Sequence, residues 1–239
     1  MPAPAFCPNI GIYGRDQIDA TQSRGCALWP AGYAAAVKEA GGTPFALQLP
    51  ETGSFWDEPP EALDGVLFLG GFPSSGRRSA GEERLCLWCQ DQRIPFLGVD
   101  QGLHVLNAAH GGTLHTDLRR ELPQALQHQH VPEPGDRHAI LVTQGTKMAR
   151  FYGEGEIVVN SEHLRAVNKV GRGFVVSARA LDAVTEAIEY QGDDWFAIGV
   201  QWHPASASAS GLDIQLFRGF IDACTERHGA FAGSPLAAA

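Results

Sequence analysis

The sequence contains neither a long apolar segment nor a cluster of basic side chains. At most two Lys or Arg residues are adjacent, and the net charge is -9 with 19% charged residues. Nucleic acids and anionic membranes attract basic surfaces, so we expect neither as a partner. No apolar run approaches the ~20 residues that span a bilayer, and the first residues lack the charged start and apolar core of a signal peptide. We therefore expect a cytoplasmic protein.

Cysteines are few, and their number is odd. Five cysteines in 239 residues do not suggest a disulfide framework. Cys86 and Cys89 have the spacing of a redox pair or of half a zinc site, but they lie within a helical pattern, and no second pair follows at zinc-finger distance. We favour the simpler interpretation, in which both thiols lie on a helix face that packs inward.

A chain of 239 residues can bury a full core, and one large α/β domain fits this length better than two small ones. In the first half, short apolar segments alternate with helical patterns; from residue 139 onward, shorter segments predict paired, partly antiparallel strands. We predict an α/β fold with an open, mostly parallel sheet flanked by helices and antiparallel strands in the C-terminal half. One domain is expected over residues 1–228, followed by a flexible tail over 229–239.

The segment around Asp100 is the main candidate site. Residues 94–98 form an apolar run of strand length, and residues 103–109 repeat apolar side chains at helical spacing. Between them, Gly98-x-Asp100-x-Gly102 has the form of a nucleophile elbow, where small flanking residues let a strained turn lift one side chain over a helix N-terminus. Glycine and aspartate are also common in ordinary turns, which is the alternative.

A second candidate is His203, which follows an apolar strand over residues 196–200. Open α/β sheets place their chemistry at the carboxyl ends of strands, so Asp100 and His203 are expected to face each other. A histidine that only holds its loop by a hydrogen bond is the alternative. The glycine-rich loop over 70–76 offers backbone N–H groups that either hold an oxyanion or merely turn the chain.

The order of these motifs resembles the class I glutamine amidotransferase-like family, and most of all its γ-glutamyl hydrolase branch, peptidase C26, which includes the γ-glutamyl-γ-aminobutyrate hydrolases. The resemblance covers residues 9 to about 223 and implies a flavodoxin-like three-layer sandwich. The matching segments lie at residues 9–12, 33–44, 64–71, 95–107, 111–118, 159–163, 177–189 and 199–204.

The resemblance also implies a catalytic triad, from which this chain departs. Family members carry a cysteine nucleophile where this sequence has Asp100, and a glutamate where it has Ala205. The triad histidine is retained as His203. A second histidine expected after His163 is Leu164. By the same resemblance, oxyanion and substrate-binding positions are assigned to Gly70, Gly71, Gln101, Ser161, Glu162 and His163.

These departures change the expected chemistry. A thiolate attacks an amide through a thioester that forms and hydrolyses readily, whereas a carboxylate would have to form a high-energy mixed anhydride. We therefore expect no cysteine-type glutaminase activity. The helix N-terminus favours the ionised form of Asp100, and His203, without a carboxylate at position 205, is expected to pair with it.

Three hypotheses follow. The protein is a remodelled enzyme in which Asp100 acts as base or nucleophile and His203 activates water; or it is a pseudoenzyme that binds a small ligand or regulates a partner. In the third hypothesis, Asp100 and His203 hold a metal ion together with Glu162 or His163. We expect a small-molecule substrate or ligand, assign no cofactor and no metal ligand, and leave a homodimer open.

Overall fold

The computed structural model describes residues 6–14, 32–49, 62–70, 80–129 and 137–232. The helices are α1 (Gly32–Glu39), α2 (Ala80–Asp91), α3 (Gln101–Ala109), α4 (Leu118–Glu121), α5 (Lys147–Tyr152) and α6 (Ile214–Ala232). The strands are β1 (Asn9–Gly14), β2 (Thr43–Ala46), β3 (Gly65–Gly70), β4 (Phe96–Val99), β5 (Thr113–His115), β6 (Arg137–Val142), β7 (Gly155–Asn160), β8 (Ala166–Lys169), β9 (Phe174–Ala180), β10 (Thr185–Tyr190) and β11 (Ala197–Val200).

The described strands form one mixed sheet of eleven strands. Its main path runs β2-β1-β3-β4-β11-β10-β9-β6-β7, while β8 pairs with β10 and β5. The five strands from β2 to β11 are parallel, and the strands from β10 to β7 pair in antiparallel fashion. This arrangement confirms the predicted α/β fold, with its parallel first half and its antiparallel C-terminal half.

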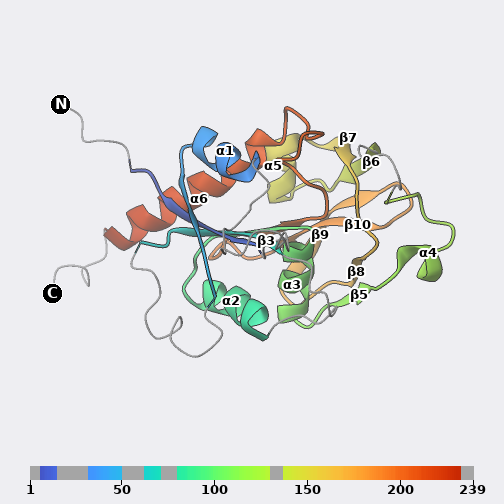
Figure 1. Cartoon of the computed structure of the whole chain (residues 1–239), viewed down its shortest axis with the longest axis horizontal. Coiled ribbons are helices and arrows are strands. Elements are labelled where there is room, and N and C mark those ends of the chain that lie inside the picture. Colours follow the sequence, from blue (N-terminus) through green and yellow to red (C-terminus); the bar gives the residue numbers. More distant parts are fainter. Residues whose placement is uncertain (1–5, 15–31, 50–61, 71–79, 130–136, 233–239) are drawn as a thin grey trace, which may run out of the picture.

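Helices cover both faces of the parallel half. Figure 1 shows α1 and α6 on one side of the sheet and α2 and α3 on the other, while α5 lies beside α6 over the antiparallel strands. Because successive strand residues point to opposite faces, Leu67 on β3 joins the core that contains Phe220 of α6. Its neighbour Phe68 joins the opposite core with Leu85 of α2 and Leu103 of α3. Two apolar cores therefore fix the sheet edge that carries the site.

The cysteine pair packs inward, as predicted. Cys86 and Cys89 lie on α2 and are fully buried, and burial raises the pKa of both thiols above the ordinary value. The described cysteines are all free. Within the described residues, no helix is long and apolar enough to cross a membrane.

Helix α5 and strand β8 are among the elements that were not predicted, and α6 runs past the expected start of the tail. Helix α5 depends on distant support, because the Glu189 carboxylate accepts the N–H groups of Lys147 and Met148, at 2.7 and 3.0 Å. Strand β8 has only four residues, too few for a clear periodicity. Helix α6 continues to Ala232, past the boundary expected at residue 228. Residues 233–239 lie outside the described part.

Candidate functional site

Asp100 occupies a strained turn between β4 and α3, as the elbow pattern predicts. Its backbone angles are φ 48° and ψ -102°, a combination that residues with a side chain rarely adopt. Its N–H donates a hydrogen bond of 2.8 Å to the carbonyl oxygen of Val200 on β11. The turn is therefore tied to the neighbouring parallel strand and presents a half-buried carboxylate at the start of α3.

The two glycines of the elbow are required by close backbone packing. A Cβ atom at Gly102 would lie 2.1 Å from the carbonyl oxygen of Phe68 on β3, closer than any real contact of this kind. A Cβ atom at Gly98 would lie 2.7 Å from the carbonyl carbon of Gly102. Both positions therefore need glycine if the strand, the turn and the helix are to pack this tightly.

The Asp100 carboxylate belongs to a buried hydrogen-bond chain. Gln201 donates from Nε2 to Asp100 Oδ1 at 2.6 Å, and its Oε1 lies 2.8 Å from His104 Nε2. Gln201 is fully buried, and burial lowers the pKa of His104, so the ring is neutral and its Nε2–H donates to Gln201. The chain fixes the orientation of one oxygen of Asp100.

His203 is held by different partners. Asn160 clamps its backbone, since Asn160 Oδ1 accepts the His203 N–H at 2.8 Å and Asn160 Nδ2 donates to the His203 carbonyl oxygen at 3.0 Å. Ring nitrogen Nδ1 lies 3.4 Å from the hydroxyl oxygen of Tyr33 on α1. Burial, together with the negative charge of Asp100, raises the pKa of Tyr33, so this side chain is a neutral phenol.

Asp100 and His203 lie at the carboxyl ends of neighbouring parallel strands but do not form a direct pair. They follow β4 and β11, neighbouring parallel strands in which Val99 is opposite Val200. Among the described contacts, no hydrogen bond or ion pair joins the two side chains. The expected direct pairing is not seen because Gln201 engages the carboxylate of Asp100, while His203 has Tyr33 beside its ring. The sheet therefore sets them as separate groups on one edge.

The remaining predicted site residues divide between this edge and another cluster. Gly70 ends β3 and Gln101 begins α3, where the first N–H groups of a helix have no intrahelical acceptor. Gly71 lies outside the described residues. Ser161 donates from Oγ to the carbonyl oxygen of His128 at 2.8 Å, and Glu162 is exposed. His163 is buried, and its Nε2 faces Glu186 at 3.3 Å.

The metal hypothesis for Asp100 and His203 is not supported by this geometry. In the described part of the chain, the metal-ligating side chains that converge in a group of three or more are His128, His138 and Glu186. His163 contacts Glu186 of that group, whereas Asp100, His203 and Glu162 do not belong to it. The ligands proposed from the sequence are thus not brought together.

Sequence reasoning assigned no role to Tyr33, Asn160 or Gln201. Tyr33 and His203 are 170 residues apart, and no local pattern connects them. Asn160 and Gln201 each follow the apolar part of a strand, directly before a polar loop. Their position at strand ends, the same signal that singled out His203, is what could have identified them.

Comparisons with known proteins identify the family of the chain and agree with its fold. The family model described as Peptidase C26 matches residues 73–205. Gamma-glutamyl-gamma-aminobutyrate hydrolase of Escherichia coli O157:H7 is 34% identical to the chain, with 80% of this chain and 84% of that protein covered. A Mycobacterium tuberculosis protein named "Putative glutamine amidotransferase" is 38% identical over 151 residues, covering 62% of this chain and 46% of its own length. The chain thus spans less than half of the latter relative.

A solved structure supports the fold. The glutamine amidotransferase of Thermotoga maritima superimposes with a TM-score of 0.59 over 97% of this chain and 87% of that chain, at 15% identity. At this identity the similarity speaks for the fold alone.

Proposed function

Because the chain belongs to the peptidase C26 family of class I glutamine amidotransferase-like proteins, we propose that it is a hydrolase that cleaves a small γ-glutamyl amide or a related ester. The observation that carries the proposal is the strained backbone of Asp100. Such strain costs about 1–3 kcal/mol and persists where a side chain must be presented to a ligand. A γ-glutamyl substrate is supported by the name of the Escherichia coli relative.

In this proposal Asp100 replaces the cysteine nucleophile of the family, and Ala205 replaces the triad glutamate. Direct attack of a carboxylate on an amide carbon would give a mixed anhydride, which is far higher in energy than the amide and would collapse back to substrate. The role that remains for Asp100 is general base toward water. Thiol-dependent glutaminase chemistry is therefore absent.

The reaction that follows is direct hydrolysis. Gln201 engages Oδ1 of Asp100, so we assign Oδ2 to the attacking water. As the water oxygen bonds to the substrate carbonyl carbon, Asp100 takes one of its protons; the backbone N–H of Gln101 stabilises the oxyanion. The C–N or C–O bond then breaks, and Asp100 gives the proton that it took from water to the leaving group, so that Asp100 returns to its carboxylate form.

His203 is the hydrogen-bond donor assigned to the leaving group, and Tyr33 takes over the orienting role of the missing glutamate. A neutral Tyr33 phenol donates its O–H to His203 Nδ1. The ring N–H at Nε2 then donates a hydrogen bond to the departing nitrogen or oxygen, while Asp100 supplies the proton. A hydroxyl at 3.4 Å holds the ring more weakly than a carboxylate.

The alternative is a pseudoenzyme that binds a γ-glutamyl ligand or regulates a partner without turnover. One observation favours it: Asp100 and His203 each have another partner and share no described hydrogen bond. In this case the elbow carboxylate serves as a fixed negative charge for a ligand.

Product release from a panel of γ-glutamyl amides and esters, followed by mass spectrometry, separates the two functions. We expect turnover by the unmodified protein, and a loss of about 10²-fold or more in Asp100→Asn, as for a removed general base. Asp222→Asn, an exposed carboxylate on α6, is the matched control and should keep full activity. Turnover that survives in Asp100→Asn contradicts the role of Asp100. Ligand-induced thermal shifts without turnover support the pseudoenzyme.

A further inference from the structure

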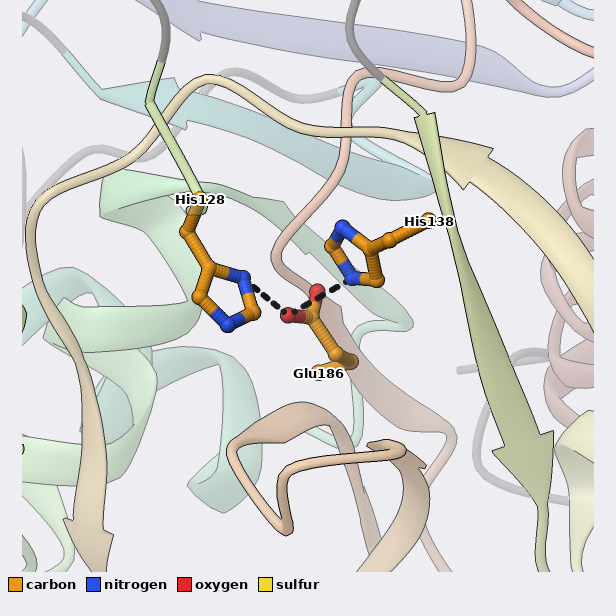
Figure 2. Close-up of side chains that lie close together, drawn as sticks. All are labelled: His128, His138 and Glu186. Atoms are coloured by element: carbon orange, nitrogen blue, oxygen red, sulfur yellow. Dashed lines mark ion pairs between the residues drawn. The ribbon is translucent and has the colours of Figure 1, made fainter. Parts of the chain in front are cut away.

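Three histidines converge on one carboxylate oxygen in a part of the molecule to which the proposed reaction assigns no role. His128 Nδ1, His138 Nε2 and His163 Nε2 lie 3.3, 3.2 and 3.3 Å from Glu186 Oε1. His138 is on β6 and Glu186 on β10, while His128 and His163 come from the segments after α4 and β7. Figure 2 shows His128 and His138 on opposite sides of the Glu186 carboxylate, each with a ring nitrogen pointing at it.

The cluster is buried and its facing atoms lack hydrogen bonds. Side-chain exposure is 1% for His128, 8% for His138, 2% for His163 and 0% for Glu186. The three facing nitrogens and both Glu186 oxygens have no described hydrogen-bond partner, although the distances are short. Buried polar atoms are almost always satisfied, so this many atoms without a hydrogen bond at one point favour a common partner.

The outer partners of two rings fix which nitrogen carries the proton. His128 Nε2 lies 2.8 Å from the Asp182 carboxylate, and His163 Nδ1 lies 2.9 Å from the carbonyl oxygen of Arg165. Both of these atoms are acceptors, so the ring nitrogens that face them carry hydrogen. In a neutral ring the other nitrogen then directs a lone pair at Glu186. A lone pair directed at a carboxylate repels it unless a metal ion or a proton lies between them.

We propose that His128, His138 and Glu186 form a binding site for a divalent transition-metal ion of the zinc class, with His163 facing Glu186 beside it. Two imidazole nitrogens and one carboxylate are a donor set that Zn²⁺ and its first-row neighbours favour. Two ligand atoms at about 2.0–2.1 Å from a tetrahedral zinc lie about 3.3 Å apart, which agrees with the spacing of His128 Nδ1 and His138 Nε2 from Glu186 Oε1.

The surroundings also match those of metal-binding histidines. A histidine ligand commonly donates its second N–H to a carboxylate or a backbone carbonyl, which orients the ring. Asp182 does this for His128. His128 and the neighbouring His163 also line a hollow of about 320 Å³ beside α4, so one ligand borders a space open to small molecules.

The site connects to the elbow through the backbone. The N–H of Gln201 donates to the Glu186 carbonyl oxygen at 2.8 Å, and the Gln201 side chain binds Asp100. The metal would hold together segments that are far apart in the sequence, including the chain around His128, whose carbonyl oxygen also accepts from His163 N–H at 2.9 Å. A metal ion that binds only the folded state raises the thermal stability, which gives a readout independent of catalysis.

Metal content and zinc affinity of the full-length protein test the proposal. Elemental analysis and Zn²⁺ titration against a chromophoric chelator should show one tightly bound Zn²⁺ per chain. Thermal denaturation should show a higher melting temperature with Zn²⁺ than without it. Glu186→Gln should lower the affinity by more than about tenfold, and Asp182→Asn, which leaves the ligands in place, by about 10- to 100-fold. His115→Asn is the matched control, because His115 forms a separate pair with Glu121 at 2.8 Å. The zinc affinity of this variant should be unchanged.

Co²⁺ binding is measured with the unmodified protein, so a variant that fails to fold cannot affect the result. Four-coordinate Co²⁺ with nitrogen and oxygen ligands should give intense visible absorption that Zn²⁺ displaces. A folded, unmodified protein that binds neither ion, or an unchanged affinity in folded Glu186→Gln, overturns the proposal. The cluster would then be a set of protonated imidazole rings paired with Glu186.

Discussion

The Gln201 amide donates a hydrogen bond of 2.6 Å to the Asp100 carboxylate and thereby connects the elbow to His104. Gln201→Met keeps the size of the side chain but leaves Asp100 Oδ1 and His104 Nε2 without their partner. Unsatisfied buried polar groups cost about 1–3 kcal/mol, so the free energy of unfolding should fall by that amount in urea denaturation. Gln191→Met, at an exposed position, should change it by less than about 0.5 kcal/mol. Equal effects at both positions would contradict the assigned role.

Gly102 should tolerate no side chain. In Gly102→Ala, the new Cβ would lie 2.1 Å from the Phe68 carbonyl oxygen, and backbone atoms of β3 and α3 must separate to admit it. We expect a loss of about 3 kcal/mol or more in the free energy of unfolding, at the upper end for overpacked cores. Gly229→Ala is the control: it is helical with nothing within 4 Å of the new Cβ, and should stabilise the protein by roughly 0.5–1 kcal/mol. If Gly102→Ala left the free energy of unfolding unchanged, the close packing of the elbow would be refuted.

Asp213 gives a pH dependence with a defined sign. Its carboxylate accepts from the Tyr152 hydroxyl at 2.7 Å and from Trp202 Nε1 at 3.2 Å, yet burial raises its pKa above the ordinary 3.8 despite these bonds. The folded state therefore holds the proton more tightly than the unfolded state. The contribution of Asp213 to stability is full below pH 3.8 and falls as the pH rises through the folded-state value. Urea denaturation of the unmodified protein and Asp213→Asn should show their stability difference shrinking over that interval; a difference that grows with pH would reverse the assignment.

Tyr33→Phe tests the orientation of His203 separately from substrate binding. The change removes the hydroxyl 3.4 Å from His203 Nδ1 and keeps the buried ring. A hydrogen bond worth about 1 kcal/mol corresponds to roughly a fivefold fall in kcat, with little change in KM. The matched variant Tyr190→Phe alters a ring that packs against Trp195 and should leave kcat unchanged. A rise in KM alone would assign Tyr33 to substrate binding.

The parallel half of the fold and the elbow could be predicted because their signals are local. A buried strand such as β3 is a continuous apolar run, and the glycines around Asp100 mark a turn that only small residues allow. The partners of the site could not be predicted in this way. Tyr33 reaches His203 across 170 residues. The four residues of the histidine cluster come from separate segments, and only the fold brings them together.

Incorporation of ¹⁸O from labelled water tests the central claim, that Asp100 directs water onto the substrate carbonyl. The unmodified protein is incubated in H₂¹⁸O with its best γ-glutamyl substrate under single-turnover conditions. Mass spectrometry then measures the masses of the acid product and of the proteolytic peptide that contains Asp100. We predict one ¹⁸O in the product and none in the peptide, with product formation slowed by about 10²-fold or more in Asp100→Asn. Label in the Asp100 peptide would make Asp100 a nucleophile, and a product pool without label would show that this chain does not hydrolyse the substrate; either result contradicts the account.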